Sequence, residues 1–298
     1  MTFRRETCFL PEASGRKVRI AGDSHRVLVS FFLLALLVLS FACRGTRAPG
    51  SATTELTIAA ASDLTPAFEE IGREFEARDR IKPVFVYGST GLLTRQIENG
   101  APFDVFAAAN ESYIDQLQQK GLIVEGTKTI YGRGRITMWI SADSTLKLEK
   151  IQDLVSPDVH RIAIANPDHA PYGQAAREAL QSAGIWQTVQ PKLVYGDNVR
   201  QALQFAETGN VEVAIVAVSL SAQNKGLCVL IPETLHKPLL QAMAVMKVTK
   251  NEDAARSFND FVIGSRGREI LAKYGFSFDS HTSVQIREPT NLCRQLSQ

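Results

Sequence analysis

Residues 84–97 read Val84-Phe-Val-Tyr-Gly-Ser-Thr-Gly-Leu-Leu-Thr-Arg-Gln-Ile97, and the stretch changes character at its glycines. Its first four residues are β-branched or aromatic, which predicts a strand, whereas apolar residues then recur at helical spacing. The segment Gly88–Gly91 is therefore a turn from a strand into a helix, and the first N–H groups of that helix lack intrahelical partners. Such a turn can bind an anion, although a Ser/Thr cap on an ordinary helix gives the same pattern.

The same strand–turn–helix order recurs along the chain. This alternation predicts an α/β fold in two lobes, each a mostly parallel sheet flanked by helices, with ligands at the carboxyl ends of the strands. The predicted strands are 56–61, 84–87, 103–108, 135–140, 161–165, 191–195, 211–218 and 241–248, and the predicted helices include 174–183 and 253–274.

Four predicted strand ends have a similar composition. Each continues into a hydroxyl, an amide or a glycine and then a helix, at Ser62-Asp63, Ser89-Thr90-Gly91, Tyr172-Gly173 and Asp197-Asn198-Val199. Helix N-termini and hydroxyls at these turns supply hydrogen-bond donors, which favours binding of a small, fully ionised oxyanion.

Asp63 is the exception in this set of donors, because a carboxylate repels a dianion. We expect its side chain to cap its own helix and to leave the backbone N–H for the ligand. An oxyanion that keeps a proton, such as phosphate, needs an acceptor, which this set of turns does not otherwise offer.

The composition is that of a soluble globular protein. The chain has 298 residues and a net charge of +2, which allows one large domain or two average ones and indicates no nucleic-acid partner. No phosphate-binding Walker motif is present, and none of the five histidines lies in a recognisable nucleophile motif. We therefore expect no enzyme activity, a solvent-facing His169, and a buried Cys228 within a strand.

The N-terminus predicts export. The uncharged segment 27–42 follows several Arg and Lys residues, which is typical of a signal peptide. Leu39-Ser-Phe-Ala-Cys43 resembles a bacterial lipobox, so we expect a signal peptide over 1–43 and lipidation of Cys43. The alternative is an ordinary signal peptide cleaved near Ala42 or Ala48. Residues 44–54 are small and polar, as in a tether.

Several of these motifs together resemble one family, the periplasmic molybdate-binding proteins of ABC transporters. The resemblance covers about residues 55–278, in order and without large gaps. The motifs are Ala59-Ala-Ala-Ser-Asp-Leu64, Tyr87-Gly-Ser-Thr-Gly91, Arg95-Gln-Ile-Glu-Asn-Gly-Ala-Pro-Phe-Asp-Val-Phe106, Asn166-Pro-Asp-His-Ala-Pro-Tyr-Gly173, Asp197-Asn-Val199 and Lys273-Tyr-Gly-Phe276.

The resemblance implies a site in a cleft between two lobes, in a type II periplasmic-binding-protein clamshell. The family's contacts to the oxyanion carry over to Ser62, Thr90, Tyr172 and the backbone N–H of Val199. Some members have a ligand-binding tyrosine at the position of Ala217, and those members have alanine at the position of Tyr172. We therefore expect the phenol to be supplied by Tyr172 instead.

The resemblance also implies the organisation and partners of the chain. Lobe I is expected over 55–132 and 244–280, lobe II over 133–243, and a disordered tail over 281–298. The ligand is expected to be molybdate or tungstate, with no cofactor and no metal bound as a free cation. The expected partner is a membrane permease of an ABC transporter, with a monomeric protein held to the membrane only by its lipid.

Two other classes of function stay open on the sequence alone. The same fold could bind sulfate, phosphate, phosphonate or ferric ion, although Tyr87, Tyr172 and Tyr195 are too scattered for a ferric site. It could also serve as the effector domain of a regulator, but the N-terminus offers a secretion signal and no helix-turn-helix.

Overall fold

The computed structural model describes residues 54–221 and 226–278, which all belong to one compact unit of the chain, Thr53–Gln298. The predicted signal peptide, Cys43, all of the predicted tether except Thr54, and the predicted tail over 281–298 lie outside the described residues. Among the described residues, no helix is both long enough and apolar enough to cross a membrane.

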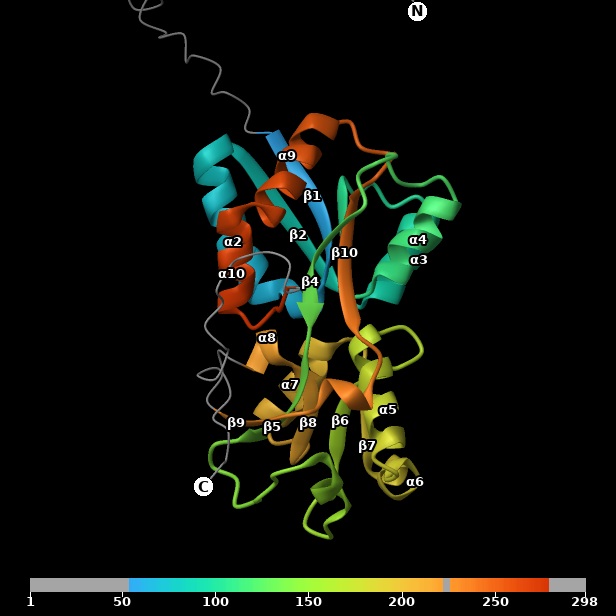
Figure 1. Cartoon of the computed structure of the whole chain (residues 1–298), viewed down its shortest axis with the longest axis vertical. Helices are drawn as coiled ribbons and strands as arrows, with labels where there is room; N and C mark the ends of the chain where they lie inside the picture. The colour runs from blue at the N-terminus through green and yellow to red at the C-terminus, as the bar shows by residue number, and fades with distance from the viewer. Residues whose placement is uncertain (1–53, 222–225, 279–298) are drawn as a thin grey trace, which may run out of the picture. The chain divides into compact units, whose positions relative to one another are not determined.

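The first sheet has the strand order β2-β1-β3-β10-β4 (Figure 1). Strands β1 and β2, and β1 and β3, pair in parallel, whereas β10 is antiparallel to both of its neighbours. The strands are β1 (Thr54–Ala61), β2 (Ile81–Gly88), β3 (Val105–Ala108), β10 (Leu239–Val245) and β4 (Thr129–Gly134); the helices beside them are α2 (Thr65–Asp79), α3 (Thr90–Glu98), α4 (Glu111–Gln119), α9 (Glu252–Ile263) and α10 (Ser265–Lys273).

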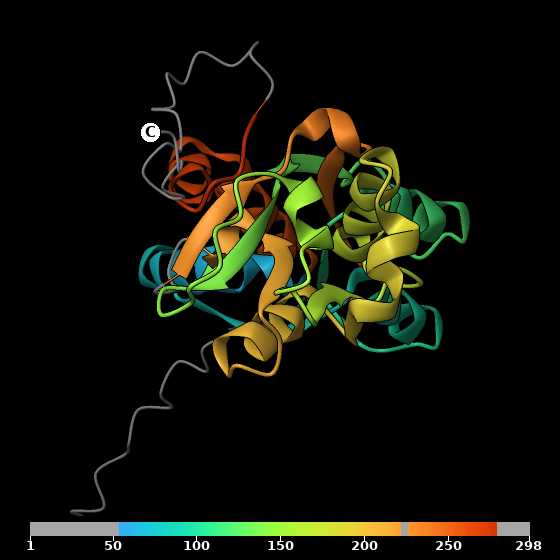
Figure 2. The ribbon, with the colours of Figure 1, turned by 90° about the horizontal axis from the view of Figure 1, so that it is seen from below.

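The second sheet repeats this plan with the order β7-β6-β8-β5-β9. Here β6 is parallel to β7 and β8, and β5 is antiparallel to β8 and β9. Figure 2 views this sheet from below, with α5 and α6 in yellow. The strands are β5 (Ile136–Ser141), β6 (Ile162–Ala165), β7 (Leu193–Gly196), β8 (Val213–Ala217) and β9 (Gly226–Leu230); the helices are α5 (Pro171–Ser182), α6 (Trp186–Val189), α7 (Val199–Glu207) and α8 (Val218–Ser221).

Aromatic packing holds α2 and α9 against the first sheet. Phe68 and Phe75 lie on the apolar face of α2 and are fully buried, as the helical spacing predicts. Phe258 of α9 contacts both in edge-on geometry, with ring centroids 5.8 and 5.2 Å apart. This core fixes the start of α2, which follows the short 3-10 helix η1 (Ser62–Leu64) at the end of β1.

The predicted α/β fold with two lobes is confirmed, and four strands of each sheet run in one direction while β10 or β5 runs against them. Lobe I holds the first sheet and lobe II the second. The predicted boundaries at 132/133 and 243/244 fall inside β4 and β10 of the first sheet, and the residues at which the chain passes between the lobes stay a proposal.

The structure differs from the predicted elements in three places. Strand β4 has no predicted counterpart. The predicted helix over 253–274 is two helices that meet at Gly264, where the backbone is extended. Helix α5 begins at Pro171 and not at the predicted residue 174, because proline fits the first turn of a helix, and Tyr172 therefore lies in that turn.

Candidate functional site

The four predicted strand ends meet at one pocket between the lobes. All four predicted contact residues line it, whereas Ala217 does not. Its free volume is about 10 Å³, close to what one water needs, so an oxyanion enters only if the lining groups move apart. The lining residues are Ala61, Ser62, Asp63, Gly88, Ser89, Thr90, Ala109, Ala170, Pro171, Tyr172 and Val199.

Lobe I presents two hydroxyl groups to this pocket. The N–H of Ala109 donates to Thr90 Oγ1 over 3.0 Å, and the Thr90 hydroxyl proton has no acceptor among the described residues. The Ser62 side chain likewise makes no hydrogen bond to another described residue. Ser89, the neighbouring hydroxyl, caps α3 by accepting from Leu92 N–H over 3.4 Å. Ser62 and Thr90 are therefore the donors that the local structure leaves available.

Lobe II presents the first turn of α7. Asn198 caps this helix, because its Oδ1 accepts from the N–H groups of Arg200 and Gln201 over 3.0 and 3.1 Å. No described residue accepts from the Val199 N–H, which precedes these two in the helix. Val199 itself is buried at the pocket, so its N–H is the donor that this cap leaves over.

Two further contacts join the lobes beside the pocket. Gly91 N–H donates to the His169 carbonyl over 2.8 Å, and Ser89 Oγ lies 2.8 Å from His169 Nδ1. A Cβ on Gly91 would lie 2.6 Å from the His169 oxygen, so only glycine permits this approach. His169 is half-buried, and the prediction that it faces solvent is wrong. The Gly91 N–H is therefore already bonded to the other lobe and is not available to an anion.

A buried hydrogen-bond network lies directly behind the pocket. Asp63 Oδ2 accepts from the Tyr172 hydroxyl over 3.0 Å and from Gln241 Nε2 over 2.8 Å. Gln241 Nε2 also lies 2.9 Å from the Tyr172 oxygen, and Tyr131 donates to Gln241 Oε1 over 2.8 Å. The prediction that Asp63 caps its own helix is wrong, since neither η1 nor α2 has a side-chain cap.

Asp63 has an unusual environment for a carboxyl group. It is fully buried, its Oδ1 has no hydrogen-bond partner, and no cation forms an ion pair with it among the described residues. Burial raises its pKa to about 6, against the opposing effect of the hydrogen bonds from Gln241 and Tyr172. This carboxyl can therefore gain or lose a proton near neutral pH.

Sequence reasoning missed Gln241 and Tyr131 as part of the site. Gln241 is the one polar residue of β10, Leu-Leu-Gln-Ala-Met-Ala-Val, and it is fully buried. A lone amide in an apolar strand indicates a specific buried partner, and that signal was available. Gly134 leaves the space that these side chains occupy, because a side chain there would overlap the Tyr172 hydroxyl and the Gln241 amide.

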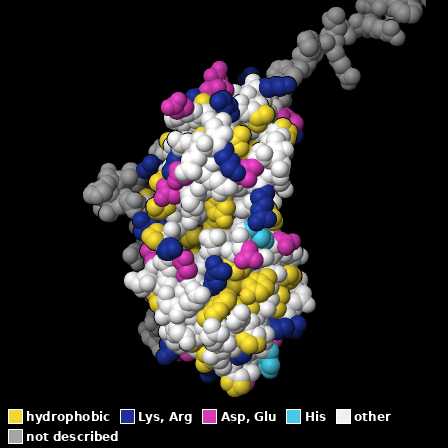
Figure 3. Space-filling view, turned by 90° about the vertical axis from the view of Figure 1, so that its right-hand side faces the viewer, with side chains coloured by type: hydrophobic (Ala, Val, Ile, Leu, Met, Phe, Trp, Pro, Cys, Tyr) yellow, Lys and Arg dark blue, Asp and Glu magenta, His cyan; other side chains and the backbone are white. Residues whose placement is uncertain are grey.

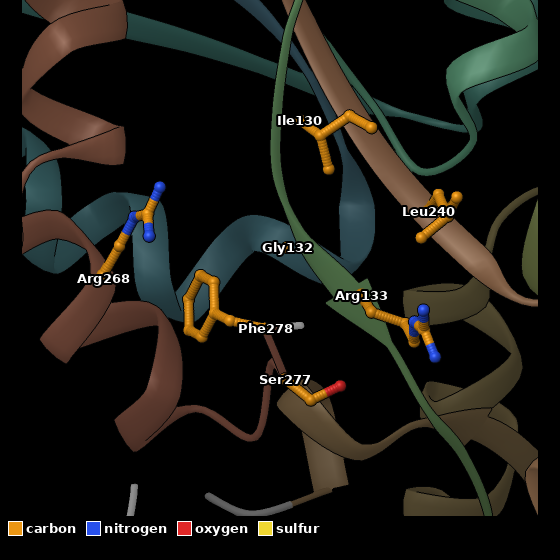
Figure 4. Close-up of a pocket in the computed structure, with 7 residues that line it drawn as sticks. All are labelled: Ile130, Gly132, Arg133, Leu240, Arg268, Ser277 and Phe278. Carbon is orange, nitrogen blue, oxygen red and sulfur yellow. The ribbon is translucent and has the colours of Figure 1, made fainter. Parts of the chain in front are cut away.

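A second cavity lies away from these residues. It has a volume of about 150 Å³ and none of the predicted contacts lines it (Figure 4). Arg268 lies over the Phe278 ring at 5.7 Å and donates to the Ile263 carbonyl. Its lining is Ile130, Gly132, Arg133, Leu240, Arg268, Ser277 and Phe278.

Metal and charge patterns give no further candidate. The described residues contain no group of three or more His, Cys, Asp or Glu that could hold a metal ion. On the face in Figure 3, acidic and basic side chains are interspersed. Cys228 is buried in β9, as predicted.

The profile described as bacterial extracellular solute-binding protein matches residues 56–277. The chain belongs to that family. It is 34% identical over 227 residues to a molybdate-binding protein of Rhodobacter capsulatus, covering 76% of this chain and 89% of the relative. It is also 27% identical over 256 residues to a putative ABC transporter substrate-binding lipoprotein of Bacillus subtilis, covering 85% and 98%.

A solved structure agrees with the assignment of this chain to the solute-binding proteins. The periplasmic molybdate-binding protein of Azotobacter vinelandii superposes with a TM-score of 0.71 at 26% identity, covering 75% of this chain and 99% of that one. The predicted resemblance to periplasmic molybdate-binding proteins is therefore confirmed. Two of these relatives are named as molybdate-binding proteins and the third as a putative substrate-binding lipoprotein of an ABC transporter.

Proposed function

We propose that this protein captures molybdate, or tungstate, outside the cytoplasm and delivers it to the membrane permease of an ABC transporter. The observation that carries the proposal is the pocket at which Ser62, Thr90, Tyr172 and Val199 converge from four separate turns. The names of the relatives support the choice of ligand. No catalytic step is part of this function.

The proposed contacts all donate to oxygen atoms of the ligand. Ser62 and Thr90 act through hydroxyl groups, Val199 through its N–H, and Tyr172 through its phenol. Hydrogen bonds to a charged group contribute about 1.5–3 kcal/mol each. Four such bonds and the further N–H groups at the same turns outweigh the free-energy cost of association. Their sum is consistent with sub-micromolar affinity.

A second candidate ligand is hydrogen phosphate. The observation in its favour is the unpartnered Oδ1 of Asp63 in a residue that lines the pocket. An ionised Asp63 is the acceptor that a protonated oxyanion needs, and the hydroxyl and N–H donors alone do not supply one. The affinity for phosphate therefore distinguishes a molybdate site from a hydrogen phosphate site.

Calorimetric titration of the protein with molybdate, tungstate, sulfate and phosphate at neutral pH tests the proposal. We expect molybdate and tungstate to bind far more tightly than phosphate. Sulfate should bind weakly, because it is smaller and cannot reach all four turns at once. Phosphate binding as tight as molybdate binding would favour the second candidate.

Anchoring is proposed to depend on Cys43, which we infer to be lipidated. The relative in Bacillus subtilis is described as a lipoprotein, which supports this. Cys43→Ser should release the protein from the membrane fraction while molybdate affinity stays unchanged, as fractionation and titration of the same preparation will show. A wild-type protein that is soluble and begins at or beyond Arg44 would contradict the anchor.

A further inference from the structure

The Tyr172 hydroxyl has one proton and two groups that need it. In the structure this proton points to Asp63 Oδ2, 3.0 Å away, while the phenol oxygen accepts from Gln241 Nε2. A hydroxyl donates only once. Tyr172 therefore cannot donate to an ionised Asp63 and to an oxyanion in the pocket at the same time.

We propose that Asp63 is a positioning residue that takes up one proton when the oxyanion binds, which turns the Tyr172 hydroxyl from Asp63 to the ligand. This inference rests on the proposed oxyanion function. The proton comes from the solvent and goes to Asp63 Oδ2, which then donates to the Tyr172 oxygen. The phenol proton is thereby left for the ligand, which keeps its charge of −2.

The surrounding contacts fix which atoms can exchange roles. The Tyr131 oxygen lies 2.8 Å from Gln241 Oε1 and 3.0 Å from the Ala108 carbonyl oxygen. Gln241 Nε2 donates to Asp63 Oδ2 over 2.8 Å, and an ionised Asp63 needs a donor there, so the Gln241 amide keeps its Nε2 side towards Asp63 and Tyr172. The space for this amide and the phenol exists because Gly134 has no side chain. Asp63 Oδ1 has no partner to lose. The one bond that can reverse direction is the bond between Asp63 and Tyr172.

The charges around Asp63 favour uptake of the proton. The titratable groups that face it are Tyr172 of α5 and Tyr131 of β4, and the pKa of each is raised well above its usual range, first by burial. β10 and α8 carry no charged residue, and Glu69 of α2 and Arg200 of α7 are exposed. A dianion beside an ionised Asp63 is thus uncompensated, which favours the neutral acid.

Calorimetry of the wild-type protein tests this without any substitution. Sodium molybdate is titrated at pH 7.5 in two buffers of different ionisation enthalpy, which gives the number of protons exchanged. We expect uptake of close to one proton at pH 7.5, because free Asp63 is then mostly ionised. Uptake should fall as the pH approaches 5.5, and Kd should rise by up to tenfold per pH unit above about pH 7.

Three variants locate the proton. Asp63→Asn should abolish the uptake and remove the pH dependence of Kd, because its amide can donate to the Tyr172 oxygen at every pH. Tyr172→Phe should reduce the uptake, since no hydroxyl needs to be released. Tyr195→Phe removes an exposed hydroxyl outside this network, so it should behave as the wild type.

The contrary outcomes are distinct. Tight molybdate binding by the wild type with no proton uptake at pH 7.5 would overturn the inference and leave the proposed function intact. Full uptake in Asp63→Asn would place the proton elsewhere, and full uptake in Tyr172→Phe would show charge repulsion without a reversed hydrogen bond. If the wild type binds no molybdate at pH 5.5 or 7.5, the proposed function and the inference both fail.

Discussion

The two walls of the pocket are built in different ways. In lobe I, the hydroxyl of Thr90 is oriented by the N–H of Ala109, a residue of the same lobe. In lobe II, the hydroxyl of Tyr172 is oriented by Asp63, which belongs to the other lobe, and by Gln241 on β10. The lobe I donors thus exist before the lobes close, whereas the phenol takes its position only in the closed protein.

This difference indicates that lobe I supplies preformed donors, whereas the lobe II phenol links ligand binding to closure. A prepared wall loses little entropy when a ligand binds to it, whereas a wall assembled by closure couples ligand binding to the closed state. Substitutions in the two walls should therefore fail in different ways.

The largest effect is expected at Gly91, whose N–H donates to the His169 carbonyl of the other lobe over 2.8 Å. Gly91→Ala places a Cβ 2.6 Å from the backbone oxygen of His169, so the lobes cannot reach the closed arrangement. We expect Kd for molybdate to rise by about a hundredfold or more, or roughly 3 kcal/mol, with little change in the melting temperature without ligand. Gly132→Ala, where an added Cβ would meet no atom closer than 3.5 Å, is the control for adding a methyl group without a clash. A variant that binds normally would show that this contact is not required.

The next effect concerns stability and pH at Asp63. Its pKa is about 6 in the folded protein, against an ordinary value of 3.8. A raised pKa stabilises the fold below about pH 4, and this contribution is lost as the pH rises through about 6. Two pKa units correspond to about 3 kcal/mol. When the pH is raised from 4 to 8, the free energy of unfolding of the wild type should therefore fall by up to about 3 kcal/mol more than that of Asp63→Asn.

Urea unfolding at both pH values, without ligand, measures this difference. Asp197→Asn is the matched control, because Asp197 is an exposed carboxyl at a neighbouring turn. An equal difference between Asp63→Asn and the wild type at pH 4 and pH 8 would contradict a raised pKa at Asp63.

Removing one hydroxyl from each wall compares the walls directly. Tyr172→Phe should weaken molybdate binding by about tenfold to a hundredfold, the value of one bond to a charged ligand of about 1.5–3 kcal/mol. Thr90→Val should weaken binding similarly and also lower the free energy of unfolding, because the buried Ala109 N–H loses its acceptor. Tyr195→Phe, at an exposed tyrosine, serves as the control. If Tyr172→Phe binds molybdate as tightly as the wild type, the phenol does not contact the ligand. Tyr172 then does not replace the tyrosine that other members have at the position of Ala217.

The smallest effect is expected from the side chain of Val199. Val199→Ala keeps the N–H, so Kd should change by less than about threefold although buried methyl groups are lost. Val199→Pro removes the N–H at the first position of α7, which tolerates proline, and should cost about tenfold. Titration of both variants compares them. Equal affinities would show that this N–H does not contact the ligand.

Much of this arrangement could be predicted from the sequence because it depends on local patterns. Strand–helix alternation placed four turns at one edge of the sheets, and the family resemblance selected one contact residue in each. The structure brings all four, Ser62, Thr90, Tyr172 and Val199, to one pocket. The antiparallel strands β5 and β10 could not be predicted from alternation, because strand direction depends on long-range pairing.

The role of Asp63 was beyond a local reading. Its position at the start of α2 suggested a cap, but its partners Tyr172 and Gln241 are 109 and 178 residues away in the sequence. The interlobe role of His169 was missed for the same reason, since Ser89 is 80 residues away. Local chemistry predicts which groups are present at a turn, and tertiary contacts decide which of them are already engaged.

The most direct test of the account is a crystal structure of the protein grown with molybdate, with molybdenum located by its anomalous scattering. We expect one molybdenum peak in the pocket, with ligand oxygens within hydrogen-bond distance of Ser62 Oγ, Thr90 Oγ1, the Tyr172 hydroxyl and the Val199 N–H. A peak outside this pocket, or a ligand in it that none of these four groups contacts, would contradict the central claim.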